Sequence, residues 1–207
     1  MKSDQSTSTK NQAWFVIGGL LAMAAALPAI VATEAYAATR PVADMFTATT
    51  ANMTPAGVNL RMQILEWQEA DARAEVVATL VAGVDAATPL GKLPTVGYIW
   101  PNGSPVGYSV KYAHRAPEPD GGERITLVTD KPLGSYDFKG WSVASSAPKS
   151  QAPYSVIELD MNSSGTGSGS FSLFGEVSLD EEAGTVTLKA ATPSLLTNVK
   201  RETEQQR

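Results

Sequence analysis

Apolar and polar residues alternate along much of the chain between residues 45 and 200. At residues 58–64, for example, Val58, Leu60 and Met62 fall on one side of an extended segment, and the polar residues between them fall on the other. This period of two is typical of half-buried strands. It returns at residues 106–114, 124–129, 156–161, 171–179 and 185–189, and more weakly at 45–50, 95–100 and 195–200. We therefore predict about eight or nine strands.

One segment, residues 69–82, departs from this alternation. Its apolar positions recur at intervals of three and four: Ala70, Ala74, Val77, Leu80 and Val81. An acidic first turn suits the dipole of a helix, and Gly83 can end it. The segment predicts one amphipathic helix, packed on the sheet or across the end of a barrel.

Short turn segments link the predicted strands at residues 101–105, 117–122, 162–169 and 180–184. Short links join neighbouring antiparallel strands, so the order is that of a meander. The fold class is therefore mainly β, and we predict a barrel, with a two-layer sandwich as the alternative. A loop at residues 131–153 is longer and carries three aromatic residues, including Trp141.

The N-terminal residues 1–37 have the composition of a signal peptide. Lys2 and Lys10 precede an uncharged run at residues 13–32, and Ala35 and Ala37 supply the small residues that cleavage requires. The alternative is an uncleaved anchor, because the apolar run is long enough to cross a bilayer. We predict a single exported β-domain at residues 38–200, periplasmic or extracellular, followed by a polar tail at 201–207. It meets the membrane only through the signal segment before cleavage.

The amino-acid composition limits the kinds of site that the chain can form. The chain has no cysteine, which excludes disulfides, thiolate metal sites and a catalytic thiol. The net charge is −5, and no basic run of the kind that binds nucleic acid is present. His114 is the only histidine, so a site that needs two imidazoles is excluded. We predict no metal and no cofactor.

Three polar motifs resemble functional sites but are explained more simply by the fold. Residues 160–165 have the spacing of a calcium loop, but Phe171 stands where its last acidic ligand belongs. The glycine-rich residues 165–169 resemble a phosphate loop but precede a strand instead of a helix. Glu158 and Asp160 share one face of a strand, where they could act as an acid and a base. We expect a hairpin turn in the first two cases and solvent-facing carboxylates in the third.

The aromatic residues are the best candidates for a ligand site. Val106, Tyr108, Val110, Tyr112 and His114 alternate along one predicted strand, and this face is either core or a cavity wall. Aromatic side chains with polar tips are typical of small-ligand pockets, and equally of an ordinary core. The candidate ligand-binding residues are Tyr98, Trp100, Tyr108, Tyr112, His114 and Trp141.

Several segments together resemble an uncharacterised family of small exported bacterial proteins of unknown function. They are residues 95–100, 108–113 and 120–125, the later runs 155–159 and 165–169, and the closing residues 195–200. The likeness covers roughly residues 57–200. It implies an exported bacterial domain, and it implies no activity, substrate or site residue.

These features lead to three functional hypotheses. The first is a non-enzymatic exported domain that binds a small apolar or amphipathic ligand or an envelope protein. It follows from the apolar, aromatic strand face and from the lack of a recognisable catalytic motif. The second is a small hydrolase in which His114 has a serine or acidic partner. The third is a structural envelope component that assembles through an uncovered sheet edge.

Overall fold

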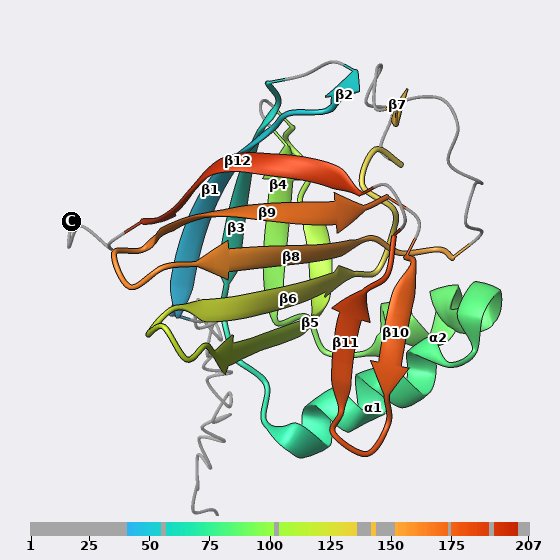
Figure 1. Ribbon diagram of the computed structural model, residues 1–207. Coiled ribbons are helices and arrows are strands. Elements are labelled where there is room, and N and C mark those ends of the chain that lie inside the picture. Colours follow the sequence, from blue (N-terminus) through green and yellow to red (C-terminus); the bar gives the residue numbers. More distant parts are fainter. Residues whose placement is uncertain are drawn as a thin grey trace, which may run out of the picture. The chain divides into compact units, whose positions relative to one another are not determined.

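The computed structural model describes residues 41–54, 57–101, 104–135, 142–143, 152–173, 175–190 and 193–202. The predicted signal segment and Trp141 lie outside these residues. Figure 1 shows a barrel with two helices and a hairpin on its outside. None of the helices in the described ranges is long and apolar enough to cross a membrane.

The barrel is a closed antiparallel meander. Neighbours around it follow chain order, namely β1 (Asp44–Thr50), β3 (Asn59–Ile64), β4 (Gly97–Pro101), β5 (Tyr108–Pro117), β6 (Glu123–Thr129), β8 (Val156–Met161), β9 (Thr166–Ser172) and β12 (Ser194–Glu202). The first and last of these strands pair with each other and close the barrel. The structure thus confirms the predicted mainly β fold, and it is a barrel instead of a sandwich. The short strands β2 (Met53–Thr54) and β7 (Ser142–Val143) pair separately.

The barrel interior is filled by the apolar set of the alternating pattern. Between register shifts, every second residue of a strand points inward, as the pleat requires. These side chains form one buried cluster, and its largest members include Phe46, Met62, Ile99, Tyr108 and Phe171, each fully buried. Barrels of eight strands are just wide enough to be filled in this way or to hold one small ligand. Here side chains occupy the interior.

A second layer covers one side of the barrel wall. It contains α1 (Ala70–Leu80), the 3-10 helix η1 (Gly83–Ala86), α2 (Ala87–Lys92) and the hairpin of β10 (Val177–Asp180) and β11 (Thr185–Leu188). Its apolar side chains meet outward-facing residues of β5, β6 and β8 in a second buried cluster, which includes Val77, Leu80, Tyr112, Val128 and Val156. The predicted helix is present, but α2 was not predicted, and Val81 is 53% exposed instead of buried.

A β-bulge at Lys111 changes which side of β5 faces inward. Val110 pairs with Thr129 and Tyr112 pairs with Val128, so Lys111 is an extra residue on this strand. The side chain of Gln68 fills the bulge: its Nε2 donates to the Lys111 carbonyl (3.1 Å) and its Oε1 accepts from the Ala113 amide (2.9 Å). The predicted continuous face from Val106 to His114 is therefore wrong.

The Lys111 side chain is itself buried and ends at the helices. Its Nζ donates to the carbonyls of Gly91 (3.3 Å) and Leu93 (2.8 Å) and to the hydroxyl of Thr95 (3.0 Å). The first two carbonyls lie at the end of α2, where a cation is favoured by the helix dipole. Burial lowers the pKa of this ammonium group, and Asp130 partly offsets that effect. Lys111 therefore ties the covering layer to the barrel.

Two other segments differ from the sequence prediction. The predicted strand at residues 171–179 is two strands, β9 and β10, because the chain turns at Gly175, which has a φ of 54°.

The predicted turn at 162–169 is shorter, since Thr166 already belongs to β9. Gly169 faces the interior, where an added Cβ would lie 2.8 Å from Leu159 Cδ2. The glycine run is thus a strand that allows close packing.

The polar tail begins later than predicted. Arg201 and Glu202 belong to β12, and Arg201 Nε lies 3.1 Å from Asp44 Oδ1. Arg201 also pairs with Glu123, and Trp67 Nε1 donates to Asp44 Oδ2 at 2.8 Å. These groups come from the ends of β1, β6 and β12 and from the residues after β3, so they close one end of the barrel with ion pairs and an indole.

Candidate ligand groove on the barrel wall

The structure places the predicted ligand-binding residues in several different environments. Tyr108 lies in the barrel core, where its hydroxyl accepts from the Gly134 amide (2.9 Å). Tyr112 points outward into the second core, and its hydroxyl donates to the Gly184 carbonyl (3.1 Å) and accepts from the Val186 amide (3.2 Å). Both tyrosines are fully buried. They therefore hold the fold together at different places and do not form one wall.

His114 lies at the margin of the second core. Its ring meets Tyr112 edge to face, with centroids 6.2 Å apart. Burial lowers the pKa of the imidazole, and the nearby Arg73 guanidinium lowers it further. In the part of the chain that the structure describes, the imidazole makes no hydrogen bond to a hydroxyl or carboxylate. A general base needs such a partner, so this geometry gives the hydrolase hypothesis no support.

Tyr98 and Trp100 lie together on the outer face of β4. Both are partly exposed, and their ring centroids are 5.5 Å apart. The indole of Trp100 rests against Gly107, because a Cβ added there would lie 2.7 Å from Trp100 Cε2. On the ring, the guanidinium carbon of Arg61 stands 4.8 Å from the centroid. Trp100 also lines a cavity.

The cavity is an open groove of about 570 Å³ on the outside of the barrel, which we call the wall groove. It crosses β12, β1, β3 and β4, on the side that the helices and hairpin leave bare (Figure 1). Its volume is in the range of small-ligand sites. It is lined by Thr47, Ala48, Thr49, Asn59, Leu60, Arg61, Trp100, Pro101, Ser104, Asn198, Lys200 and Glu202.

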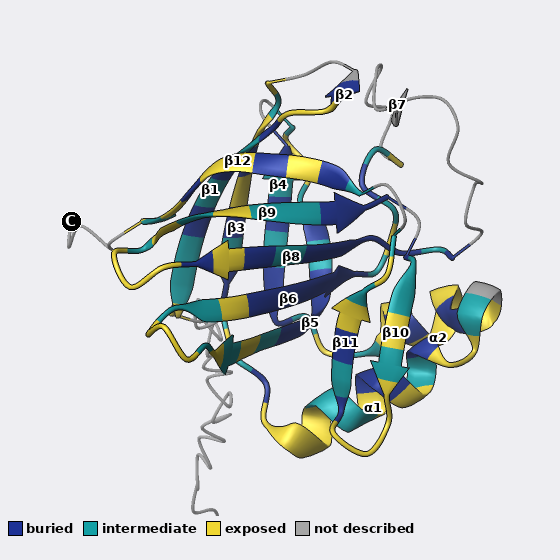
Figure 2. Cartoon of the chain, in the orientation of Figure 1, coloured by how far each residue is buried: buried dark blue, intermediate teal, exposed yellow. Residues whose placement is uncertain are grey.

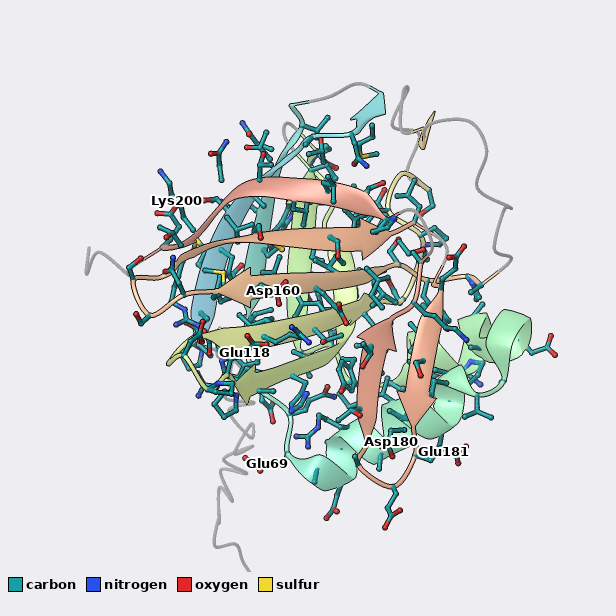
Figure 3. The ribbon with its side chains drawn as sticks, in the orientation of Figure 1. Glu69, Glu118, Asp160, Asp180, Glu181 and Lys200 are labelled. Carbon is teal, nitrogen blue, oxygen red and sulfur yellow. The ribbon has the colours of Figure 1, made fainter. Side chains whose placement is uncertain are left out.

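Strand register explains why the wall is hollow here. Trp100 pairs with Arg61, Arg61 with Thr47, and Thr47 with Lys200, so these four residues form one row across four strands. Directly opposed side chains stand about 5 Å apart on the same face. The short side chain of Thr47 in the middle leaves a hollow between the long side chains of Arg61 and Lys200. Figure 3 shows Lys200 projecting from β12 away from the covering layer.

The polar groups of the wall groove include both hydrogen-bond donors and acceptors. Thr47 Oγ1 donates to Glu202 Oε1 (2.9 Å), and Thr49 Oγ1 donates to Asn59 Oδ1 (3.0 Å), which leaves the Asn59 amide nitrogen available. Within the described ranges, the side chains of Arg61 and Lys200 form no ion pair and no hydrogen bond. With Glu202 as the single acidic residue, the lining carries a net charge of +1.

The other polar motifs have structural roles. Asn162 Oδ1 accepts from the amides of Ser164 (3.0 Å) and Thr166 (3.1 Å), so it shapes the turn between β8 and β9. Asp160 accepts from Arg124 Nε at 2.9 Å. No group of three or more histidine, aspartate or glutamate residues that could hold a metal is found among the residues described.

Glu158 is not the solvent-facing carboxylate that was predicted. It lies under the hairpin, half-buried, and its Oε1 accepts from the Leu188 amide (2.6 Å). Burial raises the pKa of this carboxyl, and the Leu188 hydrogen bond and Arg124 partly oppose the rise. Its hydrogen bond anchors β11 to the barrel.

Comparison with protein-family models, with curated proteins and with solved structures found no match. The class that the structure shows is a fold class: a closed eight-stranded antiparallel meander barrel with helices and a hairpin packed against one side. Sequence reasoning missed Arg61, Thr47 and Lys200, because these residues meet only through strand register. Their outward position in alternating strands was the one signal that the sequence offered.

Proposed function

We propose that this chain is an exported, non-enzymatic binding domain whose ligand occupies the wall groove. The observation that carries the proposal is a groove of ligand size on the bare side of a barrel whose interior is filled with side chains. The expected ligand is amphipathic instead of apolar, because one indole borders a floor of threonine and asparagine side chains. An apolar ligand inside the barrel would have to displace fully buried residues such as Phe46 and Met62.

The alternatives receive less support. A hydrolase would need a partner for His114, and the described residues supply none. Assembly through a sheet edge is opposed by barrel closure, since each of the eight barrel strands is paired on both sides. The free edges that the structure describes belong to the two-stranded β10–β11 and β2–β7 sheets.

A ligand retained from the native host would test the proposal. We would purify the wild-type chain and the variant Thr47→Tyr, which fills the hollow between Arg61 and Lys200. Thr187→Tyr, at an exposed position on β11, is the matched control. Native mass spectrometry should find an added mass on the wild type and the control, and none on Thr47→Tyr. A wild-type chain without an added mass, or an added mass that Thr47→Tyr retains, would contradict a ligand in the wall groove.

Export is tested separately by the mass of the secreted chain. Cleavage after Ala37 would leave a protein that begins at Ala38, and intact mass measurement of the extracytoplasmic fraction identifies that start. A chain that keeps residues 1–37 in the membrane fraction would favour the anchor alternative.

A further inference from the structure

We infer that the ligand of the wall groove is an acidic polysaccharide, a chain of sugars that carries carboxylate or phosphate groups. This inference rests on the proposed function, because it specifies the ligand of the same groove. The whole chain has a net charge of −5, so it does not attract polyanions in general. Attraction for an acidic ligand must therefore be local, and the wall groove holds two cations, Arg61 and Lys200, that form no ion pair with the described residues.

Arg61 is positioned to receive an acidic group. Its guanidinium lies over the Trp100 ring, and the indole is itself packed on Gly107. A guanidinium that lies over an aromatic ring keeps its planar fork of donors, which matches a carboxylate or phosphate in a bidentate way. No acidic residue among those described occupies this fork. Arg61 therefore offers a charged donor set at little cost in side-chain entropy.

Lys200 supplies a second charge at a defined spacing. It lies in the same cross-strand row as Arg61, with the β1 strand between them. Strands in a sheet are about 4.8 Å apart, so the backbone positions of Arg61 and Lys200, two strands apart, are separated by about 10 Å. A ligand that engages both cations must span Thr47, and acidic groups on successive or alternate sugars of a polymer can do so. The two charges therefore favour a repeating acidic chain over a single small anion.

The surroundings favour sugars over an acidic peptide. Peptides in extended form commonly bind by adding a strand to a sheet edge, whereas each barrel strand under the groove already has a strand on both sides. Recognition must use side chains alone. The lining offers an indole edge together with the side-chain amides of Asn59 and Asn198, and it suits a ligand with many hydroxyl groups.

The experiment compares four probes on the purified full chain by titration calorimetry. They are an oligomer of galacturonic acid, a glucose oligomer carrying phosphate monoesters, an uncharged glucose oligomer of equal length, and an oligomer of glutamate. We expect one or both acidic oligosaccharides to bind, with affinity that falls as salt is raised from about 0.05 to 0.5 M, because ions screen exposed charges. The uncharged oligomer and the glutamate oligomer should bind at least about tenfold more weakly, since the first lacks acidic groups and the second lacks sugar hydroxyl groups.

Three variants test the assignment to the groove. Arg61→Gln and Lys200→Gln should each weaken binding of the acidic oligosaccharide by about tenfold, the value of one charge-assisted contact. Lys189→Gln, an exposed lysine after β11, makes the same charge change elsewhere and should leave binding unchanged. Glu202→Gln removes the single acidic residue of the lining and should tighten binding by a few-fold, because like-charge repulsion is lost.

The outcomes separate this inference from the proposed function. Equal binding of charged and uncharged sugars, equal binding of the glutamate oligomer, or an equal loss with Lys189→Gln would overturn the acidic polysaccharide. So would the failure of both acidic oligosaccharides to bind. In each case, a native ligand that Thr47→Tyr displaces would still uphold the groove as the binding site, whereas the absence of such a ligand would remove both.

Discussion

The two sides of the barrel wall differ in what lies against them. On the side of β5, β6 and β8, outward residues such as Tyr112, Val128 and Val156 are buried by the helices and the hairpin. On the side of β12, β1, β3 and β4, outward residues such as Thr47 and Arg61 face the wall groove. Figure 2 shows the contrast: β6 and β8 are dark blue beside the hairpin, whereas β12 alternates between dark blue and yellow.

The same difference is visible in the sequence, in the pattern of apolar residues along the strands. Strands that are covered on both faces read as continuous apolar runs, and strands with one wet face alternate. Leu127-Val128 on β6 and Val156-Ile157 on β8 are apolar at successive positions, because one residue enters each core. Leu60-Arg61 on β3 places one residue in the core and the next in the groove. The covered side therefore buries apolar residues in a second core, whereas on the other side one set of residues faces the wall groove.

The largest expected effect is at Tyr112, on the covered side. Tyr112→Ala removes a fully buried ring and leaves the Val186 amide without its acceptor, so it should lower the free energy of unfolding by about 3–5 kcal/mol. Tyr112→Phe keeps the ring and should cost about 1–2 kcal/mol. Urea denaturation measures both. A loss below about 1 kcal/mol for Tyr112→Ala would mean that the covering layer adds little to the barrel.

The next effect concerns the bulge that turns Tyr112 outward. Gln68→Ala leaves the Lys111 carbonyl and the Ala113 amide unpaired in a buried site, and we expect a loss of about 2 kcal/mol. Gln68→Met keeps most of the volume without the hydrogen bonds, and its loss should be nearly as large. Should Gln68→Met have wild-type stability in the same urea assay, packing and not hydrogen bonding would be the role of Gln68.

A smaller effect is the pH dependence at His114. Its pKa is below the ordinary value of 6.5, because burial and Arg73 disfavour the charged form in the folded state. The unfolded chain then binds the proton more strongly. The contribution of His114 to stability is therefore complete above about pH 6.5 and is lost as the pH falls through the lower folded pKa.

His114 is the only histidine, so its imidazole proton signals can be followed by NMR without ambiguity. We expect a titration midpoint below 6.5. The difference in unfolding free energy between the wild type and His114→Asn should change with pH in this range alone. A titration midpoint at or above 6.5 would mean that His114 is more exposed to solvent than its position at the margin of the second core implies.

The smallest effect on stability is expected on the bare side. The double variant Arg61→Gln/Lys200→Gln removes both groove cations, which form no ion pair in the described ranges. Exposed substitutions of this kind usually change stability by no more than about 0.5 kcal/mol. Thermal unfolding should therefore match the wild type while binding is lost. A large loss of stability would show that the groove residues support the fold.

The barrel could be predicted from the sequence because its determinants are local. Alternation in each strand and short turns between strands specify a meander without knowledge of the partners. Closure also follows, since β1 and β12 both carry the alternating pattern and would otherwise be free edges. The helix α1 was found by its spacing, whereas α2 is short and contains Pro89 and Gly91, which are poor helix formers.

The bulge and the groove could not be predicted because both depend on distant residues. The orientation of Tyr112 is decided by Gln68, which lies 44 residues earlier and satisfies the backbone that the bulge leaves unpaired. The hollow at Thr47 is defined by neighbours from β3 and β12, which only the register identifies. The same dependence on distant residues explains why Tyr108 and Tyr112 do not share a face. The extra residue Lys111 reverses the direction of the side chains that follow it on β5.

Closure through β12 has a consequence for how the chain folds. The hydrogen bond from Thr47 to Glu202 joins residues 155 positions apart, so the final pairing is among the most distant that the barrel makes. Such distant contacts slow folding, because the entropy of a long loop must be lost before they form. During synthesis, β1 has no second partner until the last strand emerges. A chain that stops before Ser194 would present the unpaired edges of β1 and β9 to its neighbours, so closure of the barrel depends on the nine-residue strand β12.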